Sequence, residues 1–247
     1  MAEQNAVADF KPSINGFHFG NSFSGPDLTV HVPGIGTVDI GNASSGVCGG
    51  MAFAVRDFFE AKLPITADTV PPAAGSPLFT YITGRLFDSF HIPTGIMDYL
   101  YWMNTPDHDT GAWIAVRHGV AWLTIKDQWP AVKACIDSGQ PCPLGLVTVY
   151  SHDPDDLCHC HVVLAYGYLL DDSGNLTISV YDPNSPDNDA IEMSLNIANP
   201  SDNTPISHNI NIGFPVRGFR ALPYRWHDPS RLEPPPAPAP EHVLASA

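Results

Sequence analysis

The most regular pattern of apolar and polar positions in this chain lies just after Cys48. Apolar side chains recur there at the three- and four-residue spacing of one helical face, at Met51, Ala54, Val55, Phe58 and Phe59. Polar residues fall between them. The spacing predicts an amphipathic helix, anchored in the core, whose first turn holds Cys48.

Other stretches are also patterned. Helical spacing returns from Leu78 to Phe90, and a further helix is expected from about Asp127 to the turn at 138–141. Strand-like segments are expected at 144–150, 160–170, 176–181, 191–197, 206–212 and 216–222. Along the chain, most of the expected helices precede the strands of a mostly antiparallel sheet. This order predicts an α+β fold.

We expect one domain over residues 1–228. Within it, 1–15 reads as a polar lead-in, 16–40 as β-rich, 44–140 as mainly helical and 143–222 as an antiparallel sheet. The β-rich part opens with Phe17 and Phe19 alternating with polar residues, a pattern typical of a strand. Residues 113–125 are apolar without a clear period. The Pro/Ala-rich tail, 229–247, is expected to be disordered.

Composition narrows the classes of partner. The 247 residues are 44% hydrophobic and carry 11 Lys plus Arg against 26 Asp plus Glu, a formal charge of -15. That balance argues against nucleic acid and anionic membranes as partners. No apolar run reaches the ~18 residues of a membrane helix, and the N-terminus lacks the features of a secretory signal. The default compartment is the cytoplasm, with signal-free export left open.

Cys48 is the main candidate for chemistry. The free N–H groups and positive dipole of a helix start favour a thiolate over a thiol. Gly46, Gly49 and Gly50 leave room for a substrate backbone to approach. The alternative is a buried structural cysteine. The four other cysteines do not form a disulfide scaffold, although Cys135 and Cys142 flank a Gly/Pro turn and could pair in an oxidising setting.

A hairpin supplies the expected partners of this thiol. His161 opens one strand and Asp182 closes the next, with the turn at 171–175 between them. An antiparallel hairpin brings these ends together, and a base oriented by a carboxylate or amide is what a thiol nucleophile needs. Strict register favours Asn184 over Asp182, and a bulge would change this. His159 is the alternative base.

These motifs carry a resemblance. Gly46-Val47-Cys48-Gly49-Gly50-Met51, His161 before an apolar strand, and Val180-Tyr181-Asp182-Pro183 resemble the papain-like cysteine peptidase superfamily. The likeness is nearest to its bacterial bacteriocin-leader-peptidase-like branch. It implies a papain-like fold, with Cys48 as nucleophile, His161 as base, Asp182 as orienter, and an oxyanion donor six residues before the cysteine, at Asn42. The papain signature after the nucleophile is absent.

We therefore expect a thiol hydrolase or transferase that acts on a peptide, amide or isopeptide bond, with a peptide or protein as substrate. The alternative is a catalytically inactive binding or scaffold protein of the same shape. A third hypothesis is a metal site at Cys158-His159-Cys160-His161. Alternation along a strand would split these ligands between two faces, so no metal or other cofactor is expected.

Overall fold

The computed structural model describes residues 2–23, 27–32, 36–42, 47–111 and 115–232. Its helices are α1 (Pro12–Asn15), α2 (Cys48–Glu60), α3 (Pro77–Phe90), α4 (Thr94–Met103), α5 (Val120–Trp122) and α6 (Trp129–Asp137), with a π-helix, η1 (Leu123–Gln128), and two 3₁₀-helices, η2 (Pro154–His159) and η3 (Ser230–Leu232). Its strands are β1 (Glu3–Ala6), β2 (Asp27–Val32), β3 (Gly36–Asn42), β4 (Cys142–Val147), β5 (His161–Leu170), β6 (Asn175–Tyr181), β7 (Glu192–Asn196), β8 (Ser207–His208) and β9 (Gly218–Ala221).

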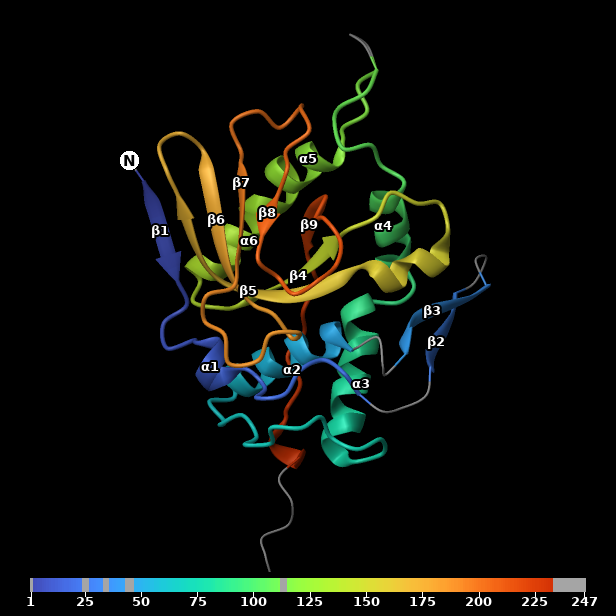
Figure 1. The fold of residues 1–247 in the computed structure, drawn as a ribbon, viewed down its shortest axis with the longest axis vertical. Helices are drawn as coiled ribbons and strands as arrows, with labels where there is room; N and C mark the ends of the chain where they lie inside the picture. The colour runs from blue at the N-terminus through green and yellow to red at the C-terminus, as the bar shows by residue number, and fades with distance from the viewer. Residues whose placement is uncertain (1, 24–26, 33–35, 43–46, 112–114, 233–247) are drawn as a thin grey trace, which may run out of the picture.

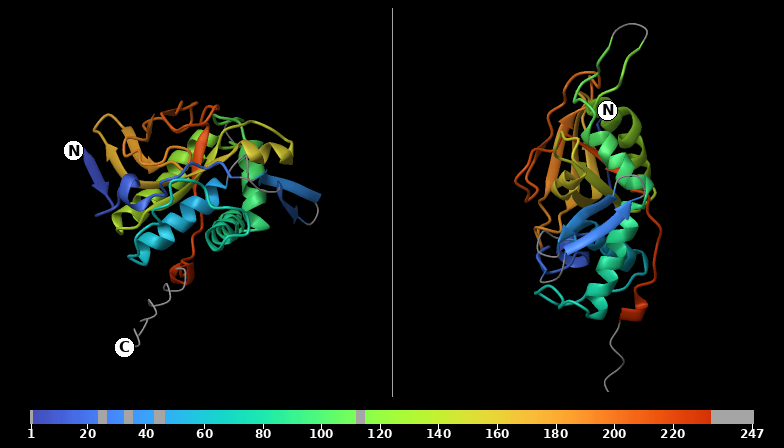
Figure 2. Two further views of the ribbon diagram at one scale, coloured as in Figure 1. Left: turned by 60° about the horizontal axis from the view of Figure 1, so that its bottom comes forward. Right: turned by 90° about the vertical axis from the view of Figure 1, so that its right-hand side faces the viewer.

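Seven of the described strands form one antiparallel sheet around β5 (Figure 1). The order is β8-β7-β6-β5-β4-β9, and β1 pairs with the C-terminal end of β5. Strands β2 and β3 form a separate hairpin. Helices between 77 and 137 gather on one side of the molecule and the strands from 142 to 221 on the other (Figure 2). The predicted α+β class is confirmed.

Helix α2 packs closely against α3 through a glycine. A Cβ atom added to Gly50 would lie 2.0 Å from the backbone oxygen of Ile82, so only glycine fits there. Apolar residues of α2, including Met51, Ala54 and Val55, are fully buried. This close approach fixes the helix that begins at Cys48.

A buried carboxylate fastens the C-terminal segment onto the same two helices. Asp57 of α2 accepts hydrogen bonds from Arg85 Nε at 2.7 Å and from the hydroxyl groups of Tyr81 and Tyr224 at 2.8 and 2.6 Å. The backbone N–H of His227 also donates to it, at 3.0 Å. The side chains of Arg85 and Asp57 are both almost fully buried, and burying two charges is costly. The hydrogen bonds to the Asp57 carboxylate offset that cost.

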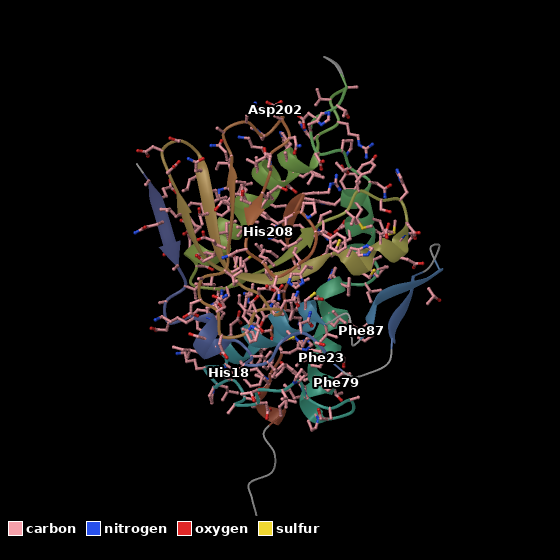
Figure 3. All side chains as sticks on the ribbon, in the orientation of Figure 1. His18, Phe23, Phe79, Phe87, Asp202 and His208 are labelled. Atoms are coloured by element: carbon pink, nitrogen blue, oxygen red, sulfur yellow. The ribbon has the colours of Figure 1, made fainter. Side chains whose placement is uncertain are left out.

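Residues 16–23 are not the strand that their alternating aromatic residues predict. The segment is irregular, yet Phe17, Phe19 and Phe23 are all buried. Phe17 stacks on Phe19 with ring centroids 4.9 Å apart. Phe23 lies beside Phe79 of α3 (Figure 3), with ring centroids 6.0 Å apart. The burial that the alternation indicated is real, but tertiary contacts achieve it without a sheet.

Other boundaries also differ. The lead-in contains β1 and α1, and the strand expected at 206–212 is reduced to β8. There the Asn209 side chain accepts a hydrogen bond from Glu192 N at 2.7 Å and donates to Ala190 O at 2.8 Å, which displaces the regular ladder. Most of the expected tail, 233–247, lies outside the described residues.

Candidate active site

Cys48 is the first residue of α2 and lies half-buried at the edge of a cavity. The backbone N–H groups of Gly49 and Val162 point to its sulfur. The first N–H groups of a helix have no helical acceptor, so they are available to a thiolate or to a bound anion. The sequence therefore places the thiol where negative charge is stabilised.

His161 brings the second group to this point from the sheet. It is the first residue of β5, and its buried ring lies in hydrogen-bond contact with Cys48. Its Nε2 lies 2.8 Å from Oδ1 of Asp182. Because the carboxylate occupies Nε2, Nδ1 is the ring nitrogen left for the thiol. The start of α2 and the start of β5 lie side by side in Figure 1.

Asp182, rather than Asn184, contacts the imidazole. The β5–β6 register shifts between Ala165 and Gly167, and the ladder ends at Tyr181. The chain then turns, with Ser185 N donating to Asp182 O at 2.9 Å. Asn184 therefore leaves the ladder before it can face His161.

The Asp182 carboxylate is held by several donors and is fully buried. Besides His161, it accepts from the backbone N–H groups of Asn184 at 3.0 Å and Asn211 at 2.9 Å, and from Ser185 Oγ at 3.1 Å. Burial opposes its charge, but the hydrogen bond and the charge of His161 outweigh burial and lower its pKa. The carboxylate is thus ionised and fixed in orientation.

The thiol and the imidazole stabilise each other's charged forms. Burial by itself would raise the pKa of Cys48, but the charge of His161, its hydrogen bond to the sulfur and the N–H groups of Val162 and Gly49 lower it. Burial by itself would lower the pKa of His161, but the charge of Cys48 and the hydrogen bond to Asp182 raise it to about 10. At neutral pH these directions favour a thiolate beside an imidazolium.

A cavity of about 280 Å³ opens onto this pair. Its lining combines apolar side chains with amide side chains and the chain at 211–214. The lining residues are Leu86, Phe90, Tyr99, Leu157, Val162, Ile212, Phe214, Asn21, Asn184, Asn211, Cys158, His159, Cys160, Gly213, Gly49, Cys48 and His161. The volume suits one side chain or a short segment of a substrate.

Asn42, the expected oxyanion donor, ends β3, and its side chain lies outside the described part of the structure, as do residues 43–46. Sequence reasoning missed Asn21, which lines the cavity. Its Oδ1 accepts from Val47 N at 2.5 Å and its Nδ2 donates to Asn184 Oδ1 at 3.0 Å. Asn21 therefore joins the residue before Cys48 to the segment that carries Asp182. It lies in an irregular stretch with no motif that would single it out.

His159 lines the same cavity but has different neighbours. Its Nδ1 lies 3.4 Å from Asp156 Oδ1, and its ring packs against Phe214 with centroids 4.9 Å apart. It ends η2, so the strand expected from Cys160 begins one residue later, at His161. Within the described ranges, no group of three or more His, Cys, Asp or Glu side chains is arranged to hold a metal ion.

In the part of the chain that the structure describes, no helix combines the length and the apolar character that a membrane crossing requires. Comparison with known proteins adds no relative to this picture: no protein-family model, no curated protein and no solved structure matches the chain.

Proposed function

We propose that this protein is a papain-like thiol hydrolase or transferase that acts on a peptide, amide or isopeptide bond, with Cys48 as nucleophile, His161 as acid–base and Asp182 as the group that orients the imidazole. The observation that carries the proposal is the contact between His161 and both partners. Its ring bonds the Cys48 sulfur on one side and Asp182 Oδ1, at 2.8 Å, on the other. A nucleophile, a base and an orienting carboxylate in this order are the parts of an acyl-transfer site.

The chemistry follows from the protonation states. The Cys48 thiolate attacks the carbonyl carbon of the substrate, and the carbonyl π electrons move onto oxygen to give a tetrahedral oxyanion. As the C–N bond breaks, the imidazolium of His161 gives its proton to the departing amine and a thioester remains. Water or a second amine then attacks the thioester with His161 as base, and the thiolate is restored.

The oxyanion would be held where α2 begins. Backbone N–H groups of the first turn and the positive end of the helix dipole favour negative charge there. Asn21 lines the cavity, and its amide nitrogen has a second hydrogen beyond the one donated to Asn184, so it is a candidate for a further oxyanion donor. Asn42 stays the alternative that the family resemblance implies.

The first experiment measures how fast iodoacetamide alkylates Cys48 as a function of pH, followed by mass spectrometry of the labelled peptide. The parent chain is compared with His161→Gln, whose amide can still bond Asp182, and with His159→Gln as a matched control in the same cavity. We expect Cys48 to react well below the pH at which an ordinary thiol ionises, His161→Gln to remove this advantage, and His159→Gln to keep it.

A second measurement addresses acyl transfer itself. The parent chain and Cys48→Ala are incubated with a peptide mixture of broad sequence composition, and new peptide ends or new amide linkages are counted by mass spectrometry. Products that need Cys48 support the proposal. Two results together would contradict the proposal and favour a binding module. Cys48 would be alkylated like an ordinary thiol with a rate that His161→Gln does not change, and no product would depend on Cys48.

A further inference from the structure

A second pair of sulfur atoms lies apart from the candidate active site. Cys135 is in the last turn of α6 and Cys142 is the first residue of β4. Neither lines the cavity at Cys48. The turn between them is closed by hydrogen bonds from Gly139 N to Ile136 O at 2.9 Å and from Gln140 N to Cys135 O at 3.2 Å. Gly139, with φ at +81°, allows this sharp reversal of the chain.

The closed turn brings the two side chains together. The Cys135 sulfur lies 3.8 Å from the oxygen of Pro141, whose carbonyl carbon is bonded to the nitrogen of Cys142. The Cys135 sulfur also lies 3.5 Å from the oxygen of Gln140, and the two thiols are close enough for each to shift the pKa of the other. Cys142 is buried, whereas Cys135 is only partly buried.

A cation is fixed beside the more accessible sulfur. Arg56 Nη1 lies 3.9 Å from the sulfur of Cys135. The guanidinium is itself held by Glu60 at 2.7 Å and lies 3.8 Å from the centre of the Tyr224 ring. The hydrogen bond from Cys142 lowers the pKa of Cys135 to about 7 against the effect of burial, and the charge of Arg56 adds to this lowering. The same hydrogen bond and burial raise the pKa of Cys142.

We propose that Cys135 and Cys142 are a reversible dithiol–disulfide pair, oxidised by hydrogen peroxide, with Cys135 as the attacking thiolate and Cys142 as the resolving thiol. The Cys135 thiolate attacks one peroxide oxygen, the O–O bond breaks, and hydroxide leaves to give a sulfenic acid. The Cys142 sulfur then attacks the sulfenic sulfur, and its thiol proton leaves with the hydroxyl group as water. Peroxide gains two electrons and the two thiols lose them. The pair does not depend on the proposed function of Cys48.

The test uses the full chain with Cys48→Ala, so that the candidate nucleophile does not consume oxidant. The protein is treated with a small excess of hydrogen peroxide at pH 7, alkylated under denaturing conditions and digested with chymotrypsin. Cleavage after Tyr150 separates Cys135 and Cys142 from Cys158 and Cys160, which trypsin leaves together between Lys133 and Arg217. We expect a peptide that contains Cys135 and Cys142 joined by a disulfide, two hydrogens lighter than the dithiol. After reduction with dithiothreitol and a second alkylation, this peptide should carry two alkyl groups.

Two further variants separate the roles. In Cys142→Ser the sulfenic acid on Cys135 has no resolving thiol, so dimedone should trap it; in Cys135→Ser, Cys142 should stay reduced. Arg56→Gln should slow the loss of the Cys135 thiol several-fold, because Arg56 contributes to the lowered pKa of Cys135. A thiol with a pKa of about 7 is about half ionised at pH 7, and an ordinary one only ~3%. A dimedone adduct on Cys135 with Cys142 present, a disulfide elsewhere, or unmodified thiols would each overturn the proposal.

Discussion

The close contact of α2 with α3 leads to a prediction about two glycines. Gly50 of α2 faces the backbone of α3, and an added Cβ would lie 2.0 Å from Ile82 O. Gly84 of α3 has no atom within 4 Å of the same added atom. Both substitutions by alanine raise helix propensity by about 1 kcal/mol. They therefore differ mainly in whether the methyl group fits.

The magnitude for Gly50→Ala follows from the overlap. Real Cβ atoms essentially never approach another atom closer than 3.0 Å, and the atom in the way is backbone rather than a flexible side chain. The helices would have to separate by roughly 1 Å, which forfeits up to about half of the dispersion energy of contacts across their interface. Overpacking of this kind costs about 3 kcal/mol at the upper end, so the net loss in the free energy of unfolding is about 2 kcal/mol.

Thermal unfolding followed by circular dichroism measures the difference. For a chain of this length, about 2 kcal/mol lowers Tm by roughly 4–8 °C, whereas Gly84→Ala should raise Tm by roughly 2 °C. Gly50→Ala should also slow alkylation of Cys48, two residues away, because α2 moves relative to β5. A Gly50→Ala protein with the parent's Tm, or equal shifts in both variants, would refute the reasoning.

Two further predictions concern buried charges. Arg85→Met leaves the Asp57 carboxylate in the core without a cation, and urea unfolding should show a loss of about 3–5 kcal/mol; an unchanged urea midpoint would contradict it. Asp182→Asn removes the charge that supports the His161 imidazolium, so the pKa of Cys48 should rise and its alkylation midpoint should move to higher pH. Superimposable alkylation profiles would show that Asp182 does not act through His161.

The shifted pKa values of Cys48 and His161 also make the stability of the folded protein depend on pH. The pKa of Cys48 is lowered in the folded protein, so its contribution to stability is present above the ordinary thiol pKa and is lost as pH falls through the lowered value. The pKa of His161 is raised, so its contribution is present below about pH 6.5 and is lost as pH rises through about 10. Lys133→Met is the surface control for Arg85→Met: its pair with Asp137 is partly exposed, so the urea midpoint should stay close to that of the parent chain.

Local patterns in the sequence predict most of the elements that the site needs. The apolar spacing after Cys48 predicts helix α2 and its start at Cys48. This prediction needs only local sequence, because the apolar positions of one helical face recur every three or four residues. The turn at 171–175 likewise predicts the hairpin of β5 and β6, and it brings the start of one strand to the end of the other. The same local reasoning failed at 16–23, where buried aromatic residues alternate without a sheet.

Only the tertiary structure decided which side chains meet at the site. The β5–β6 ladder ends at the pair Leu164–Tyr181 and the chain turns there, which places Asp182, rather than Asn184, on His161. Continued register would have put Asn184 opposite His161, and local sequence does not show where a ladder stops. Asn21 reaches the cavity from an irregular segment that carries no periodic signal. Cys48 meets His161 through the packing of α2 against the sheet, a long-range contact that depends on all the apolar surface buried between them.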